Sequence, residues 1–106
     1  MADTSLDLPA RVDIGTIQVV LDALADPVRL EIVRRLAVAP EQTSRCQVLY
    51  DGISKSTASH HFKVMREAGL TERLYVDGQL HQQLRSDALE RRYPGLLGSV
   101  LDGLGR

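Results

Sequence analysis

One stretch constrains the fold of this chain more than any other, residues 54–70 with the sequence SKSTASHHFKVMREAGL. It opens with Ser54, whose hydroxyl is of the type that caps a helix N-terminus. It closes at Ala68 and Gly69, where glycine readily takes the left-handed conformation of a helix C-terminus. The stretch therefore predicts a helix of about three turns.

Wound at about 100° per residue, this helix has two chemically different sides. The apolar side predicts contact with a core and consists of Ala58, His61, Phe62, Met65 and Ala68. The opposite side carries short hydroxyls, an imidazole and an ammonium group, from Ser56, Ser59, His60 and Lys63. Because no acidic residue precedes Glu67, the second side suits a surface that approaches phosphates and base edges. On this stretch alone, an ordinary solvated helix face is the alternative interpretation.

The chain has 106 residues, which is the size of one domain. It contains no Trp and only one Phe, so its core must be largely aliphatic, which favours a helical protein. Residues 1–11 include Pro9 and show little periodicity, and they are expected to form a flexible lead-in. Residues 12–106 are expected to form the single folded domain.

The sequence also indicates where the protein works. No apolar run approaches the roughly 20 residues of a membrane span, and the first residues lack the basic region of a signal peptide. Cys46 is the only cysteine, which excludes a disulfide within one chain and fits a reducing compartment. These features predict a cytoplasmic protein without a membrane partner.

Charge is distributed unevenly along the chain. The net charge is −1, which is not that of a strongly basic nucleic-acid-binding protein. Residues 54–85 nevertheless hold five basic and three acidic residues, whereas residues 1–53 hold five basic and eight acidic ones. The positive balance therefore lies around the central helix.

Two further helices are predicted before it. Apolar residues at helical spacing indicate a first helix from Val12 to about Ala25; they are Ile14, Ile17, Leu21 and Leu24. Asp26 followed by Pro27 is a strong start signal for a second helix, which is expected to end near Val38. Between residues 40 and 53, Thr43 or Ser44 is expected to cap a short helix that Asp51 and Gly52 end. A short helix, a turn and the central helix would form a helix-turn-helix.

After the central helix the periodicity changes to that of strands. Residues 70–76 and 79–84 flank Asp77 and Gly78, a pair typical of a two-residue hairpin turn. A hairpin directly after such a helix is a wing. The wing is expected to carry Arg73, Tyr75, His81 and Arg85 outward or near its tip.

The tail is predicted to be helical again. Ser86 or Asp87 is expected to cap the next helix, with Glu90 completing a capping box, and Pro94–Gly95 to break it. A final apolar stripe consists of Leu96, Leu97, Val100, Leu101 and Leu104. A monomer has little left to cover this stripe, so the N- and C-terminal helices are expected to form a helical dimer interface.

Three pieces taken in order resemble the ArsR/SmtB family of bacterial winged helix-turn-helix repressors. They are LDALADPVRLEIVRRL at residues 21–36, the central stretch at residues 54–70, and the hairpin centred on Asp77 and Gly78. The tail DALERRYPGLL also resembles endings in that family. The fold class expected from this is mainly α with a small β-hairpin wing, that is, a winged helix-turn-helix.

The resemblance implies a homodimer that places two recognition helices in successive major grooves of a near-palindromic operator in double-stranded DNA. It implies that five side chains enter the groove, namely Ser56, Thr57, Ser59, His60 and Lys63. Lys55 and Arg66 would then contact phosphates, and Arg73 and Arg85 would support the wing. Solvated charges are the alternative for these four basic residues, and His61 is expected to pack in the core.

The signal that such a repressor senses is a separate question. Metal-sensing members of the family carry a Cys-x-Cys near residues 44–50 or a carboxylate and histidine set in the last helix. This chain has Ser44-Arg45-Cys46 in the first region and no histidine after His81, so both familiar metal sites are incomplete. Cys46 is either a small buried residue or a redox sensor favoured by Arg45 and a nearby helix N-terminus.

The sequence thus predicts a sequence-specific regulator, specifically an autoregulatory repressor released by an unidentified effector. It requires no cofactor or metal, and no arrangement of a nucleophile with a base indicates an enzyme. One alternative is a winged-helix module that binds protein. Another is a metal-responsive repressor with an unusual site, formed either by His60, His61 and His81 or by the N-terminal residues Asp3 and Asp7.

Overall fold

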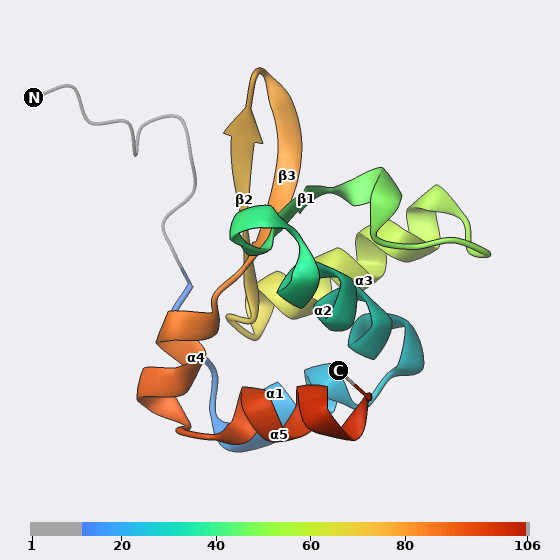
Figure 1. Cartoon of the computed structure of the whole chain (residues 1–106). Helices are drawn as coiled ribbons and strands as arrows, with labels where there is room; N and C mark the ends of the chain where they lie inside the picture. Colours follow the sequence, from blue (N-terminus) through green and yellow to red (C-terminus); the bar gives the residue numbers. More distant parts are fainter. Residues whose placement is uncertain (1–11, 106) are drawn as a thin grey trace, which may run out of the picture.

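The computed structural model describes residues 12–105. Its elements in chain order are α1 (Ile17–Leu24), α2 (Pro27–Val38), η2 (Pro40–Gln42), β1 (Thr43–Arg45), η3 (Cys46–Val48), α3 (Lys55–Glu67), β2 (Thr71–Val76), β3 (Gln79–Leu84), α4 (Ser86–Arg92) and α5 (Leu96–Gly103). The β2–β3 hairpin projects from one end of the molecule, and α1 and α5 lie at the opposite end (Figure 1). The expected class, mainly α with a small wing, is confirmed. The expected lead-in, residues 1–11, lies outside the described residues.

Both strong helix-start signals operate as predicted. The Asp26 carboxylate accepts hydrogen bonds from the amides of Val28 and Arg29 at 2.8 and 3.2 Å, and Pro27 occupies the first position of α2. The Ser54 hydroxyl accepts from the Thr57 amide at 3.1 Å and begins α3. These side chains satisfy amides that a helix N-terminus leaves without partners, so they fix where each helix begins.

The predicted inner side of α3 is confirmed, because all five of its residues are buried; they are Ala58, His61, Phe62, Met65 and Ala68. They join a core that includes Ile32, Val33 and Leu36 of α2. Burial of this side turns the opposite side of α3 toward solvent.

The wing forms as predicted. β2 and β3 are antiparallel, with Thr71 opposite Leu84 and Val76 opposite Gln79. Asp77 and Gly78 have φ values of 52° and 77°, which are the left-handed conformations of a two-residue hairpin turn. This turn fixes Val76 opposite Gln79 and so favours the observed register of the hairpin.

The prediction of a short helix capped by Thr43 or Ser44 is wrong. Residues 43–45 form strand β1, which pairs antiparallel with β3 so that the sheet has the order β1-β3-β2. Only one 3-10 turn, η3, follows before Leu49 enters the core. The outer edge of β3 offers unpaired backbone groups, and pairing with them satisfies more of this segment's backbone than a single helical turn would.

The prediction that the first helix starts at Val12 is also wrong, because α1 begins at Ile17 after the N-cap Thr16. The preceding backbone bonds to distant parts of the chain instead. The amide of Gly15 donates to the carbonyl of Ala68 at 2.9 Å, and the Tyr93 hydroxyl donates to the carbonyl of Gly15 at 2.8 Å. The segment before α1 is thus tied to the end of α3 and to the end of α4.

The tail differs from its prediction in one detail. Neither Ser86 nor Asp87 caps α4, because the helix already includes Ser86, whose hydroxyl donates to the side chain of Gln42. Glu90 does not complete a capping box, and its carboxylate accepts from the amide of Gly95 at 3.2 Å. The break at Pro94–Gly95 is confirmed, with Gly95 at φ 84° before α5 begins.

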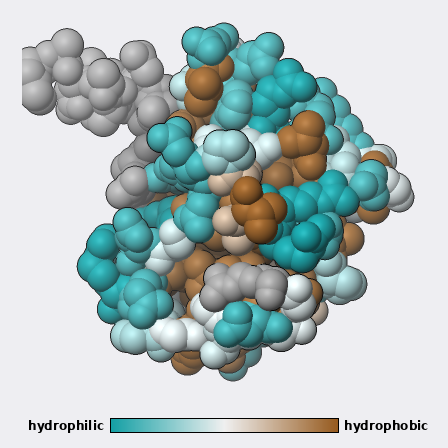
Figure 2. All heavy atoms as spheres, viewed as in Figure 1, coloured by the Kyte–Doolittle hydropathy of each residue, from teal (hydrophilic) through white to brown (hydrophobic). Residues whose placement is uncertain are grey.

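The ends of the chain leave apolar surface uncovered. In α1, the side chains of Ile17, Val19 and Leu21 are each 44% exposed. In α5 only Leu101 is buried, whereas Leu97 and Val100 are partly exposed, as is Leu104 directly after the helix. Figure 2 shows hydrophobic atoms at the surface at this end of the molecule. No helix among residues 12–105 is long and apolar enough to cross a bilayer.

An ion-pair group on α2 predicts a pH dependence of stability. Hydrogen bonds from Arg34 and Arg35, at 2.6 and 2.8 Å, lower the pKa of Glu31 from 4.5 to about 2. Because the folded pKa is depressed, the stabilisation is full above about pH 4.5 and is lost as the pH falls through about 2. Solvent screening of this exposed carboxylate limits it to about 1 kcal/mol.

The measurement is urea unfolding of the wild type and of Glu31→Gln at pH 7 and at pH 3. We expect the two proteins to differ by about 1 kcal/mol at the higher pH and by less at the lower one. An equal difference at both values would show that Glu31 acts through packing rather than through its charge.

Candidate nucleic-acid interface

The outward side of α3 is accessible along its length. The predicted contact residues exposed there are Lys55, Ser56, Thr57, Ser59, His60 and Lys63. The Ser54 hydroxyl lies 3.2 Å from that of Ser56 and 2.9 Å from that of Thr57, so the helix start presents a linked group of hydroxyls. Among residues 12–105, no hydrogen bond or ion pair engages the side chains of Ser59, His60 or Lys63.

The inner side of α3 is held to the neighbouring helices by an arginine. The Arg29 guanidinium donates to the carbonyl of Ala23 at 2.6 Å and lies 3.0 Å from Nδ1 of His61. Because a guanidinium group only donates hydrogen bonds, Nδ1 of His61 is the acceptor in this contact. His61 is 9% exposed, so it packs in the core as expected, and His60 is the histidine that faces solvent.

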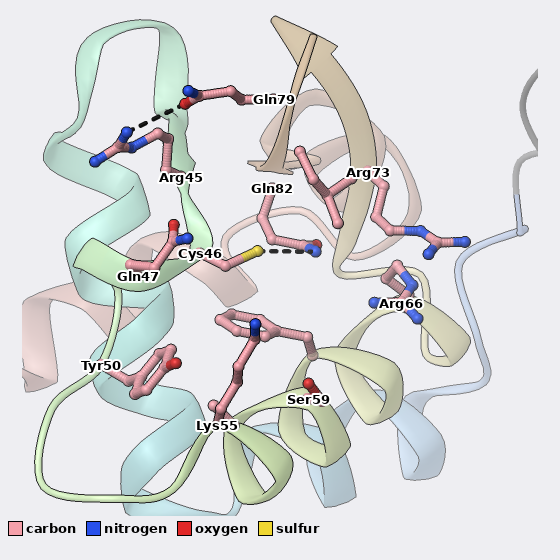
Figure 3. Close-up of a pocket in the computed structure, with 13 residues that line it drawn as sticks. Arg45, Cys46, Gln47, Tyr50, Lys55, Ser59, Arg66, Arg73, Gln79 and Gln82 are labelled. Carbon is pink, nitrogen blue, oxygen red and sulfur yellow. Dashed lines mark hydrogen bonds between the residues drawn. The ribbon is translucent and has the colours of Figure 1, made fainter.

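Arg66 and Arg73 extend the positive surface from α3 toward the wing. Figure 3 shows Lys55, Ser59 and Arg66 on α3 and Arg73 on β2, around one pocket. Burial is the main cause that lowers the pKa of Arg66, and the positive charge of Arg73 lowers it further. The two guanidinium groups therefore repel each other across a site that would favour an anion.

Arg85 is placed elsewhere, at the base of the wing. Its guanidinium donates to the carbonyl of Val12 and, at 3.3 Å, to the carbonyl of Gly69. It lines a depression different from the one that Arg66 and Arg73 share. Arg85 thus holds the wing's base to the segment before α1, and the structure does not gather it with the other predicted contacts.

The structure adds one cation that sequence reasoning missed. Arg45 is the last residue of β1 and lines the same pocket as Arg73, and it donates to the Gln79 side chain of the wing at 3.1 Å. It was missed because its position depends on the pairing of β1 with β3, for which the sequence carries no signal of its own.

Cys46 is partly buried at the start of η3, and the amide nitrogen of Gln82 lies 3.8 Å from its sulfur. Arg45, its neighbour in sequence, donates to the side chain of Gln79 instead. Among the described residues, no group of three or more His, Cys, Asp or Glu side chains is placed to hold a metal ion. The alternative set of His60, His61 and His81 is therefore not assembled within one subunit, and Asp3 and Asp7 lie outside the described residues.

Comparison with known proteins agrees with this geometry. Residues 24–73 match a family model described as a helix-turn-helix domain. The chain is 39% identical over 82 residues to the HTH-type transcriptional regulator YceK of Bacillus subtilis (strain 168), a match that covers 76% of this chain and 82% of the relative.

Solved structures show the same fold. The transcriptional repressor BigR from Xylella fastidiosa superposes with a TM-score of 0.63 at 24% identity, over 85% of this chain and 87% of that one. An ArsR-like transcriptional regulator from Rhodococcus sp. RHA1 gives a TM-score of 0.61 at 21% identity, over 83% and 77% of the two chains. The fold and the relatives are those of transcriptional regulators. With the winged helix-turn-helix and the motifs that form it, these matches show that the chain belongs to the HTH-type transcriptional regulators, and its fold is the one found in ArsR-like regulators.

Proposed function

We propose that this chain is a homodimeric, autoregulatory repressor that binds a near-palindromic operator in double-stranded DNA in the cytoplasm. The observation that carries the proposal is the outward side of α3, where exposed hydroxyls, His60 and Lys63 lie beside the cations Arg66 and Arg73. This surface pairs hydrogen-bonding groups suited to base edges with charges suited to phosphates.

The roles divide by position. We assign base contacts to the groove-facing side chains Ser56, Thr57, Ser59, His60 and Lys63. Lys55 and Arg66 contact phosphates, and Arg73 contacts the backbone from the wing. Arg85 supports the wing from its base, because its hydrogen bonds lead to the backbone at Val12 and Gly69.

Residues 12–106 form the DNA-binding and dimerisation unit in this proposal. The apolar surface of α1 and α5 supports a two-fold interface, since Ile17, Val19 and Leu21 would otherwise stay 44% exposed. The exposed hydroxyls at the start of α3 are not part of this apolar surface, so a dimer formed through α1 and α5 would leave them open to DNA. Their two-fold arrangement would match half-sites one helical turn apart.

The test is a titration of the purified protein against DNA from upstream of its own gene and against a scrambled sequence, at two salt concentrations. We expect selective binding by a dimer, with affinity that falls steeply as salt rises because phosphate contacts release counterions. Equal binding to both sequences would place the operator away from this promoter and contradict autoregulation. A lack of binding to either DNA at low salt would overturn the proposal in favour of a protein-binding module.

Cys46 is the residue we propose to test as a redox sensor of this repressor. With hydrogen peroxide as oxidant, its thiolate would gain one oxygen to give a sulfenate while the peroxide is reduced to water. The polar product would disturb the packing of η3 against the wing through Gln82. We expect peroxide to weaken DNA binding by the wild type and to have little effect on Cys46→Ser. Equal loss in both proteins would exclude Cys46 as the sensor.

A further inference from the structure

The pocket between η3, α3 and the wing has the size of a small-molecule site. Its volume is about 630 Å³, and its walls come from four segments of the described chain (Figure 3). Clefts of roughly 300–1,000 Å³ are typical of sites for small ligands. A DNA phosphate needs only cations at a surface, so the depth of this pocket is not explained by phosphate contacts alone.

The inner wall of the pocket is apolar and partly aromatic. Phe62 is the only phenylalanine in the sequence, and its ring stands edge-on to that of Tyr50, with centroids 6.1 Å apart at 65°. Leu80 of β3 lines the same pocket. Such a wall suits the flat apolar ring of a ligand, because aromatic rings pack favourably edge-to-face or offset against one another.

The charged side chains that line the pocket are all positive; they are Arg45, Lys55, Arg66 and Arg73. Among residues 12–105, no ion pair neutralises Lys55, Arg66 or Arg73. The whole chain carries a net charge of −1, so this concentration of positive charge is local. An anion between Arg66 and Arg73 would relieve the repulsion of the two groups.

Gln82 supplies a polar group deep in the same pocket. Its side chain is 1% exposed, and its carbonyl oxygen has no hydrogen-bond partner among residues 12–105. If the side-chain amide of Gln82 were rotated by 180°, its nitrogen would take the place of its oxygen. The nitrogen would then be the atom without a partner at that position. A buried polar group without a partner is costly, and a polar atom of a ligand would remove that cost.

From these observations we propose that the pocket binds a small aromatic carboxylate. Its ring packs against Phe62 and Leu80, its acid group lies between Arg66 and Arg73, and a polar substituent reaches Gln82. The second part of the inference rests on the proposed function. Because the ligand and DNA would use the same two guanidinium groups, binding of one weakens binding of the other, which makes the ligand an inducer.

The first experiment tests the site without DNA. Naphthoate is titrated into the isotope-labelled full chain while the backbone amide resonances are recorded. We expect saturable shifts at Cys46, Phe62, Leu80 and Gln82, and about tenfold weaker binding to Arg66→Gln or Arg73→Gln. Lys63→Gln is the matched control, since it removes a positive charge from α3 outside the pocket and should leave the affinity unchanged.

Two further probes separate the ligand class from simpler explanations. Naphthamide has the ring without the charge, and inorganic phosphate has the charge without the ring, so both should bind much more weakly than naphthoate. Phosphate binding as tightly as naphthoate would reduce the pocket to a phosphate contact and overturn the proposal. Shifts confined to α1 and α5, or no shifts at millimolar naphthoate, would overturn it as well.

The final step measures DNA affinity with and without naphthoate. We expect the affinity of the wild type to fall and the remaining affinity of Arg73→Gln to respond much less. Naphthoate binding without any effect on DNA affinity would overturn the inducer role and leave the site intact. If the chain does not bind DNA, the proposed function is overturned. The first experiment, which contains no DNA, still shows whether the pocket binds naphthoate.

Discussion

Gly69→Ala is expected to lower the free energy of unfolding by about 3 kcal/mol. Gly69 has φ 86°, a left-handed conformation that costs other residues energy. An added Cβ would also lie 2.7 Å from both the carbonyl oxygen of Asp13 and the Cα of Ile14. Since both contacts are with backbone, no side chain can move aside, and the crossing of the N-terminal segment over the end of α3 must open.

The measurement is urea unfolding followed by circular dichroism at one fixed protein concentration, because the proposed dimerisation would make stability depend on concentration. Gly52→Ala is the matched control, since Gly52 has φ 77° and its added Cβ would meet no atom of residues 12–105 within 4 Å. We expect it to lose only about 1 kcal/mol, the cost of the conformation itself. If the free energy of unfolding falls equally in the two variants, the segment before α1 can move away from the added Cβ at little cost.

Lys63→Ala and Arg66→Ala are expected to weaken DNA binding in different ways. If Lys63 contacts a base, its loss should cost about 1 to 3 kcal/mol on the operator and relax specificity at one position. Arg66 lines the same pocket as Arg73, between η3, α3 and the wing, so we expect its loss to weaken binding to all sequences alike and to lower the salt slope by about 1. The measurement is a set of titrations on the operator and on single-base variants, over a range of salt.

Arg91→Ala is the control for the change in charge, because Arg91 is exposed on α4, away from α3 (Figure 1). It should leave both the affinity and the salt slope close to those of the wild type. If neither Lys63→Ala nor Arg66→Ala differs from this control, the outward side of α3 is not the DNA-binding face.

Those residues of the predicted site that lie on one helix could be identified from the sequence. Ser59, His60 and Lys63 follow from the periodicity of α3 once its inner side is recognised, and the structure places them in solvent as expected. Arg85 and Arg45 were not recoverable in this way. Hydrogen bonds to backbone 16 or more residues away hold Arg85, and a strand pairing positions Arg45, so both depend on non-local contacts.

The sequence by itself determined the features that rest on local chemistry. The bounds of α2, the start of α3 and the turn at Asp77 and Gly78 follow from capping residues and backbone preferences within a few positions. These signals are strong because each satisfies backbone groups or conformations that nothing else nearby can.

Only the tertiary structure decided the remainder. Residues 43–45 became a strand because the edge of β3 was open to them, and residues 12–16 stayed out of α1 because Ala68, Arg85 and Tyr93 engage their backbone. The pocket between η3, α3 and the wing also depends on tertiary structure, since its walls come from four segments that meet only after folding. Contacts between distant segments leave no periodic trace in the sequence, and so the strand β1, the start of α1 and the pocket became visible only in three dimensions.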